Sequence, residues 1–326
     1  MEFWLPLVFV AVMGLALLLY VVLDGFDLGV GLLLPLAAEH EKDPMVASIG
    51  PFWDANETWL VLGIGVLLIA FPLAHGIILT SLYLPATLML MGLVLRGIAF
   101  DFRIKAGEGQ KGRWNRVFFF GSLLATMCQG WMLGAYVTGL DASPLSWLFA
   151  LLTALSLPAL YIMLGAAWLM CKSDTALAAK ARGWAKLAWL PMGMTLLLLS
   201  IATPLVSDRI ADKWFSLPEF LWLSPIPLLA LLIYGWIGLA LFGHAECRPF
   251  RVFMALAAIC VLAAAGLAYS IYPDIIIGRM QIHEAAAHVD SLLFTFWGVL
   301  LTLPMILGYT FFVYRIFNKG TLDHSH

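Results

Sequence analysis

Long apolar segments separated by short polar ones dominate the sequence. Nine of them are about 20 residues or longer, the length that a helix needs to cross roughly 30 Å of hydrocarbon. Their expected bounds are 5–33, 57–74, 76–100, 116–139, 145–170, 187–207, 221–243, 250–273 and 291–315. The alternation of apolar and polar residues typical of a transmembrane β-barrel is missing. The pattern therefore predicts an all-α polytopic membrane protein with nine transmembrane helices, in a single integral membrane domain over residues 1–326.

Composition supports lipid as the main solvent of this chain. Hydrophobic residues make up 63% of its 326 residues and charged residues 12%, whereas about a quarter of a soluble domain is charged. The net charge of −2 gives no reason to expect a nucleic acid partner. The cysteines have no metal-binding spacing and are expected to be free thiols. They are Cys128, Cys171, Cys247 and Cys260.

Positively charged residues predict the orientation. Fourteen Lys and Arg lie in the connections after the first, third, fifth and seventh segments, in the C-terminal tail, or at the segment ends that border these regions. The opposite set of connections holds three, which are Arg209, Lys213 and Arg279. Lys and Arg are retained on the cytoplasmic side of a membrane. We therefore expect the N-terminus outside and the C-terminus in the cytoplasm.

Two pairs of carboxyl groups form the candidate chemistry. Asp24 and Asp27 lie in "LDGFDLGVG", near the cytoplasmic end of the first segment. Asp54 and Glu57 lie in "WDANETW", where the second segment begins. Each pair has i, i+3 spacing, so its members share a face if the helix is continuous there. A charge near mid-bilayer costs roughly 3 kcal/mol or more, and such residues often mark an ion or proton route.

The third segment adds charges at the same side of the membrane. Its end, "LRGIAFDFR", contains Arg96, Asp101 and Arg103. We expect Arg96 to converge with the four acids of the first two segments. The glycines near Asp24 and Asp27 allow either a close approach between helices or a local break in the helix. They are Gly25, Gly29 and Gly31.

A purely structural interpretation of these charges is also open. Asp54 or Asn56 is a candidate N-cap of the second helix, with Glu57 favourable in its first turn. Arg96 then only neutralises an acid. Intramembrane haem generally takes an axial His or Met, and none of the seven histidines lies in the middle of a segment. We therefore expect no haem bound by this chain.

Three blocks in the first three segments carry a family resemblance. "DGFDLGVG", "PFWDANETWLV" and "LRGIAFDFR", in this order, resemble subunit II of the cytochrome bd-type quinol oxidases, and the nine-segment pattern is similar. The resemblance implies a subunit of a respiratory enzyme of the prokaryotic cytoplasmic (inner) membrane, which oxidises quinol and reduces dioxygen to water. It also implies a fold of two four-helix bundles plus one peripheral helix.

The resemblance further implies partners, cofactors and roles. Haem b and haem d (or a haem b variant) belong to the partner, subunit I, and membrane lipid and small single-helix accessory subunits are compatible neighbours. Asp27 and Asp54 match family acids, Glu57 stands where some relatives have Gln, and Arg96 and Arg103 match an orienting or interfacial pattern. Together with Asp24, the matched acids are expected to form a cytoplasmic proton path.

Two rival hypotheses use the same residues. A proton-coupled secondary transporter also needs midplane acids and broken helices, but the sequence shows no evident inverted repeat. A structural scaffold would use the acids only as helix caps. Neutral substitution of the acids separates the scaffold from the proton path, and the presence of a haem-bearing partner separates the oxidase from the transporter.

Overall fold

Nine long helices form the protein. The computed structural model describes residues 3–243 and 248–317, and nine helices in these ranges are long and apolar enough to cross a membrane. This confirms the predicted class and number. They are α1 (Trp4–Leu33), α3 (Trp53–Ala70), α4 (Pro72–Lys105), α5 (Glu108–Val137), α6 (Pro144–Lys172), α7 (Thr175–Val206), α10 (Pro225–Phe242), α11 (Pro249–Ile271) and α13 (Val289–Phe317).

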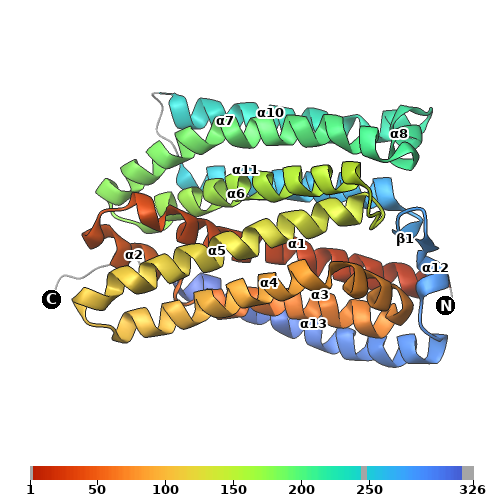
Figure 1. Cartoon of the computed structure of the whole chain (residues 1–326), viewed down its shortest axis with the longest axis horizontal. Coiled ribbons are helices and arrows are strands. Elements are labelled where there is room, and N and C mark those ends of the chain that lie inside the picture. The colour runs from red at the N-terminus through yellow and green to blue at the C-terminus, as the bar shows by residue number, and fades with distance from the viewer. Residues whose placement is uncertain (1–2, 244–247, 318–326) are drawn as a thin grey trace.

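Short elements lie at the two ends of the long helices (Figure 1). At one end, η1 (Leu34–Leu36) and α2 (Glu39–Ile49) connect α1 to α3. At the other end, α8 (Asp208–Phe215) and α9 (Glu219–Leu223) follow α7. A two-stranded antiparallel sheet and α12 lie at that same end, between α11 and α13. Their bounds are β1 (Asp274–Ile276), β2 (Met280–Gln281) and α12 (Ile282–Ala285).

Several helices begin earlier than the hydropathy pattern predicts. The second long helix starts at Trp53 instead of residue 57, and the sixth at Thr175 instead of residue 187. Polar first turns of a helix lower the local hydropathy, so an apolar window misses them. The boundary between the second and third segments also lies earlier than residue 75, because Phe71 alone separates α3 from α4. Pro72 opens α4, where its missing N–H needs no helical partner.

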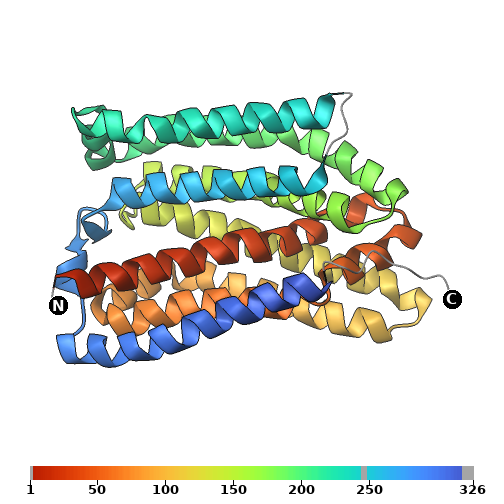
Figure 2. The same ribbon diagram turned by 180° about the vertical axis from the view of Figure 1, so that it is seen from behind.

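The helices lie side by side with α1 inside the bundle (Figures 1 and 2). Helix α1 packs against α3, α5 and α6, while α7 and α10 form an outer layer on the far side of α6 and α11. Helix α13 lies at the opposite edge, beside α3. The grouping into two four-helix bundles stays a prediction. The acid-bearing helix α1 is thus covered on several sides by protein.

Glycines allow α1 and α6 to approach closely. A Cβ atom at Gly29 would lie 1.8 Å from the carbonyl oxygen of Tyr161, and one at Gly165 would lie 2.6 Å from the backbone nitrogen of Val30. Helix α1 is continuous through this region. The glycines of "DGFDLGVG" therefore serve close packing of helices and not a break.

We predict that Gly29→Ala destabilises the protein. The added methyl group would overlap backbone atoms of α6, which cannot move aside as a side chain could. Overpacking of this kind costs about 1–3 kcal/mol. Thermal unfolding of the purified membrane protein measures the loss. Gly14→Ala is the matched control, since it lies in the same helix with nothing within 4 Å of its Cβ position, and equal stability of the two variants would contradict the prediction.

Candidate functional site

A buried arginine joins acids from two other helices. Arg96, near the end of α4, is 1% exposed. Its Nη1 atom lies 2.7 Å from Oδ1 of Asp24 on α1, and its Nη2 atom donates a hydrogen bond to Oε1 of Glu57 on α3. Gly121 of α5 allows α4 to approach closely at this point, because a Cβ atom at Gly121 would lie 3.0 Å from the backbone nitrogen of Arg96. Three helices therefore meet at one guanidinium group.

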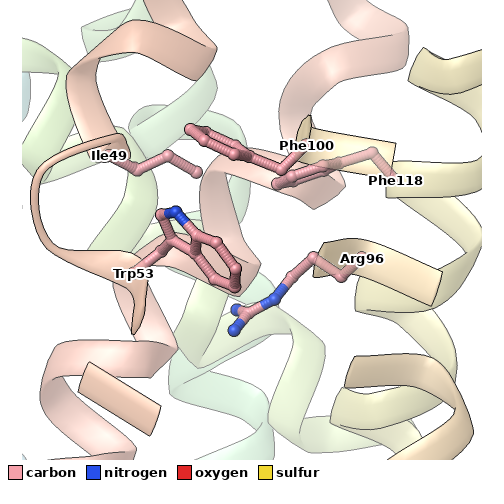
Figure 3. A pocket seen from close by; sticks show the side chains of 5 residues that line it. All are labelled: Ile49, Trp53, Arg96, Phe100 and Phe118. Carbon is pink, nitrogen blue, oxygen red and sulfur yellow. The ribbon is translucent and has the colours of Figure 1, made fainter. Parts of the chain in front are cut away.

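Apolar side chains lie next to Arg96 (Figure 3). A narrow space beside Arg96 is lined by Ile49, Trp53, Phe100 and Phe118, and it does not admit a water molecule. A buried charge that water cannot reach needs charged partners. The carboxylates of Asp24 and Glu57 are consequently the groups that balance Arg96.

A second set of hydrogen bonds reaches Asp27. The Asn56 side chain on α3 is fully buried, and its Nδ2 atom donates to Oδ2 of Asp27 at 2.8 Å and to the carbonyl oxygen of Leu23 at 3.2 Å. Its Oδ1 atom accepts a hydrogen bond of 3.0 Å from the hydroxyl of Tyr314 on α13. Neither role could be predicted from the sequence, where Asn56 is a candidate cap and no motif connects it with Tyr314, 258 residues away.

The acids differ in exposure along α3 and α1. Asp54 is exposed at the start of α3, the Glu57 side chain is 27% exposed one turn later, and Asp24 and Asp27 are fully buried. If Asp24, Asp27 and Glu57 were all ionised, the single positive charge of Arg96 could not balance them. The excess negative charge in apolar surroundings would be costly. This arrangement therefore favours one proton retained among the three carboxyls, of which only Glu57 is partly exposed.

Asp101 and Arg103 do not join this cluster. Asp101 is exposed. The buried Arg103 lies 2.6 Å from the carboxylate of Asp43 on α2 and donates to Oδ1 of Asn115 on α5 at 2.5 Å. Partial burial alone would raise the pKa of Asp43, but hydrogen bonds from Lys111 and Arg103 outweigh it and lower that pKa. Arg103 thus connects α2, α4 and α5 at one end of the molecule.

The capping interpretation of the second acid pair is wrong. Phe52 occupies the N-cap position of α3, and the helix makes no side-chain cap hydrogen bond. Asp54 lies in the first turn and Asn56 faces the interior. The helix dipole still favours a negative charge at Asp54. A stabilising role for Asp54 is therefore limited to this modest electrostatic effect.

The described histidines lie at the ends of the spanning helices or in the short elements between them. His40 lies in α2, His75 in the first turn of α4, His283 in α12, and His288 directly before α13. Within residues 3–243 and 248–317 there is no group of three metal-ligating side chains that could hold an ion. His244, Cys247, His324 and His326 lie outside the described residues.

The fold and site define a class: a polytopic membrane protein with titratable groups buried between α1, α3 and α4. Residues 5–317 match the family described as cytochrome bd terminal oxidase subunit II. The chain belongs to this family. Its helices α1 and α4 also run unbroken past their charged residues, unlike the discontinuous helices that the transporter hypothesis expects.

Individual relatives agree with the family. The chain is 26% identical to cytochrome bd ubiquinol oxidase subunit 2 of Bacillus subtilis (strain 168), over 98% of this chain and 96% of the relative. It is 25% identical to cytochrome bd-I ubiquinol oxidase subunit 2 of Escherichia coli (strain K12), over 95% and 93%. A chain in the structure of bd oxidase from Geobacillus thermodenitrificans has the same fold, with a TM-score of 0.77 at 18% identity, covering 96% of this chain and 98% of that one.

We predict that Arg96→Gln destabilises the protein by about 3–5 kcal/mol, the usual effect of removing one partner of a buried ion pair. The variant leaves Asp24 buried without its positive partner. Asp24→Asn combined with Arg96→Gln should recover part of the loss, because no uncompensated charge then remains at this pair. Denaturant unfolding of the purified protein provides the measurement. Arg113→Gln, an exposed control in α5, should change little, and an equally small effect of Arg96→Gln would refute the prediction.

Proposed function

We propose that this chain is subunit II of a quinol:dioxygen oxidoreductase and that it supports a haem-bearing subunit I. Membership of the family supports this proposal, as do relatives named as ubiquinol oxidase subunits. Haem b and haem d, or a haem b variant, are assigned to the partner, as the family resemblance implies, and none of the described histidines of this chain lies in the middle of a spanning helix. Quinol is the electron donor, and the isolated chain is not catalytic.

The role proposed for this chain's own residues is proton uptake. Reduction of one dioxygen to two water molecules consumes four protons. Asp54 is the exposed entrance of the path. Glu57, which is partly exposed, is the second position, and the buried Asp24 and Asp27 follow it. The observation that carries the proposal is this graded burial around one arginine, since a purely structural ion pair needs no additional acids leading to the surface.

The proposed orientation places the entrance in the cytoplasm. The connections rich in Lys and Arg lie at the end of the molecule that contains α2, and α8, β1 and α12 lie at the other (Figure 1). Lys and Arg mark the cytoplasmic side, so the N-terminus is outside and the C-terminus inside. Protons taken up at Asp54, with quinol protons released outside, would build a gradient without a pump.

Green fluorescent protein fused after His326 tests orientation and partnership together. We expect a fluorescent fusion, because this reporter folds in the cytoplasm and not after export through the general secretory channel. Purified through the reporter from its native membrane, the chain should bring a larger subunit and a haem absorption spectrum. Purified after expression without partners, it should carry no stoichiometric haem. A dark fusion would contradict the orientation, and one haem per isolated chain would contradict the cofactor assignment.

Asp54→Asn tests the proton path. Asn has nearly the same shape but cannot titrate, so we expect normal assembly and haem content with quinol oxidase turnover lowered at least about tenfold, as for loss of a proton-transfer group. Haem reduction by quinol should survive, since electrons enter through the partner. Glu57→Gln should be milder, because the family resemblance implies that Gln is accepted at this position.

Asp101→Asn is the matched control for Asp54→Asn, since it removes another exposed acid, which does not contact the Arg96 side chain. It should leave turnover unchanged. Stopped-flow measurement of the reaction with oxygen distinguishes the variants. Wild-type kinetics of a fully haem-loaded Asp54→Asn complex would remove Asp54 from the path.

A further inference from the structure

The Asn56 side chain lies between a buried acid and the last helix. It donates to Oδ2 of Asp27 at 2.8 Å and accepts from the Tyr314 hydroxyl at 3.0 Å. Within the described part of the chain, Oδ1 of Asp27 has no hydrogen-bond partner. The Asn56 amide is therefore the one described group that orients this carboxyl by a hydrogen bond.

The orientation of the Asn56 amide decides whether a hydrogen-bond donor or an acceptor faces the Asp27 carboxyl. An amide has a donor end and an acceptor end, and a 180° flip exchanges them. With Nδ2 toward Asp27, the carboxyl receives a hydrogen bond; after a flip, Oδ1 of Asn56 would oppose an oxygen of Asp27. In the first orientation the Tyr314 hydroxyl donates to Oδ1, so the acceptor end of the amide also has its partner. The carbonyl oxygen of Leu23, 3.2 Å from Nδ2, favours the same orientation.

Tyr314 is fixed by packing that does not involve its hydroxyl. Its ring centroid lies 4.5 Å from that of Phe52 and 6.1 Å from that of Trp168. Apart from this region, α13 is mostly exposed, and among its described residues only Leu292 and Val313 are buried hydrophobics. Tyr314→Phe therefore removes one hydrogen bond and keeps the aromatic contacts.

We infer that Tyr314 is a positioning residue for proton transfer at Asp27, acting through the Asn56 amide. The inference rests on the proposed function of the acids. It gives α13 a part in the proton path although that helix supplies no acid to the cluster. The charged groups that surround Asp27 are Asp24 on the same helix, Glu57 on α3 and Arg96 on α4, and none of them makes the hydrogen bond that Asn56 supplies.

The experiment compares single and double variants of the complex purified with its native partners. Tyr314→Phe should keep full haem content and an unchanged KM for quinol, while kcat falls about fivefold, the size expected for one lost hydrogen bond. The solvent deuterium isotope effect on kcat should rise, because proton transfer then limits turnover. Tyr309→Phe is the matched control, since it makes the same chemical change at an exposed position of α13.

The Asn56→Ala variant tests whether Tyr314 acts through Asn56. If Tyr314 acts through Asn56, then adding Tyr314→Phe to Asn56→Ala should lower kcat no further, whereas independent sites would give additive effects. Additive losses would overturn the inference. So would Tyr314→Phe kinetics equal to those of Tyr309→Phe, or loss of haem from the Tyr314→Phe complex. Asp27→Asn tests the proposed proton path separately from the role of Tyr314. Wild-type turnover in that variant would show that Asp27 is not in the proton path, and Tyr314 would then have no such role.

Discussion

The ion cluster of Arg96, Asp24 and Glu57 is the constraint around which the first half of the fold is organised. Arg96 is almost completely buried, and apolar side chains leave no room for water on one side of it. Each charge in such surroundings would be costly alone. The three side chains come from α4, α1 and α3, so these helices must keep a fixed depth relative to one another. A slip of one helical turn, about 5.4 Å, would separate the partners.

Close packing of glycines supports the same arrangement. Gly29 and Gly165 bring α1 and α6 together at backbone distance, and Gly92 and Gly121 do so for α4 and α5. In a lipid environment apolar side chains gain little by leaving the solvent, so contacts of this kind and polar interactions hold helices together. The glycine contacts set the distances between helices, and the buried charges set their register. The graded exposure of the acids follows from both.

Much of the fold, and part of the site, could be predicted from the sequence. Hydropathy reports helix length directly, which is why nine spans were predicted correctly. The i, i+3 spacing of Asp24 and Asp27 and of Asp54 and Glu57 placed each pair on one face, and topology placed Arg96 nearby. Spacing within one segment does not report contacts across helices, however. The pairing of Arg103 with Asp43 therefore stayed hidden.

Large separations along the chain explain why the contacts of Asn56 could not be predicted from the sequence. Asn56 contacts both a residue in α1 and Tyr314 near the end of the described chain. A polar residue among apolar ones predicts a buried partner but does not identify it. The start of α3 was also misplaced, since Trp53 and Asp54 lie in a polar first turn that an apolar window excludes.

The 258-residue separation of Asn56 and Tyr314 also sets an order of assembly. Chains emerge from the ribosome and enter the membrane from the N-terminus, and domains generally fold in that order. The residues of the Arg96 ion cluster are all present once α4 has been made. The hydroxyl that orients Asn56 arrives only with α13, when the last spanning helix is in place. The ion pairs of Arg96 thus need only the first three spanning helices, whereas the hydrogen bonds around Asn56 are complete only when α13 is present.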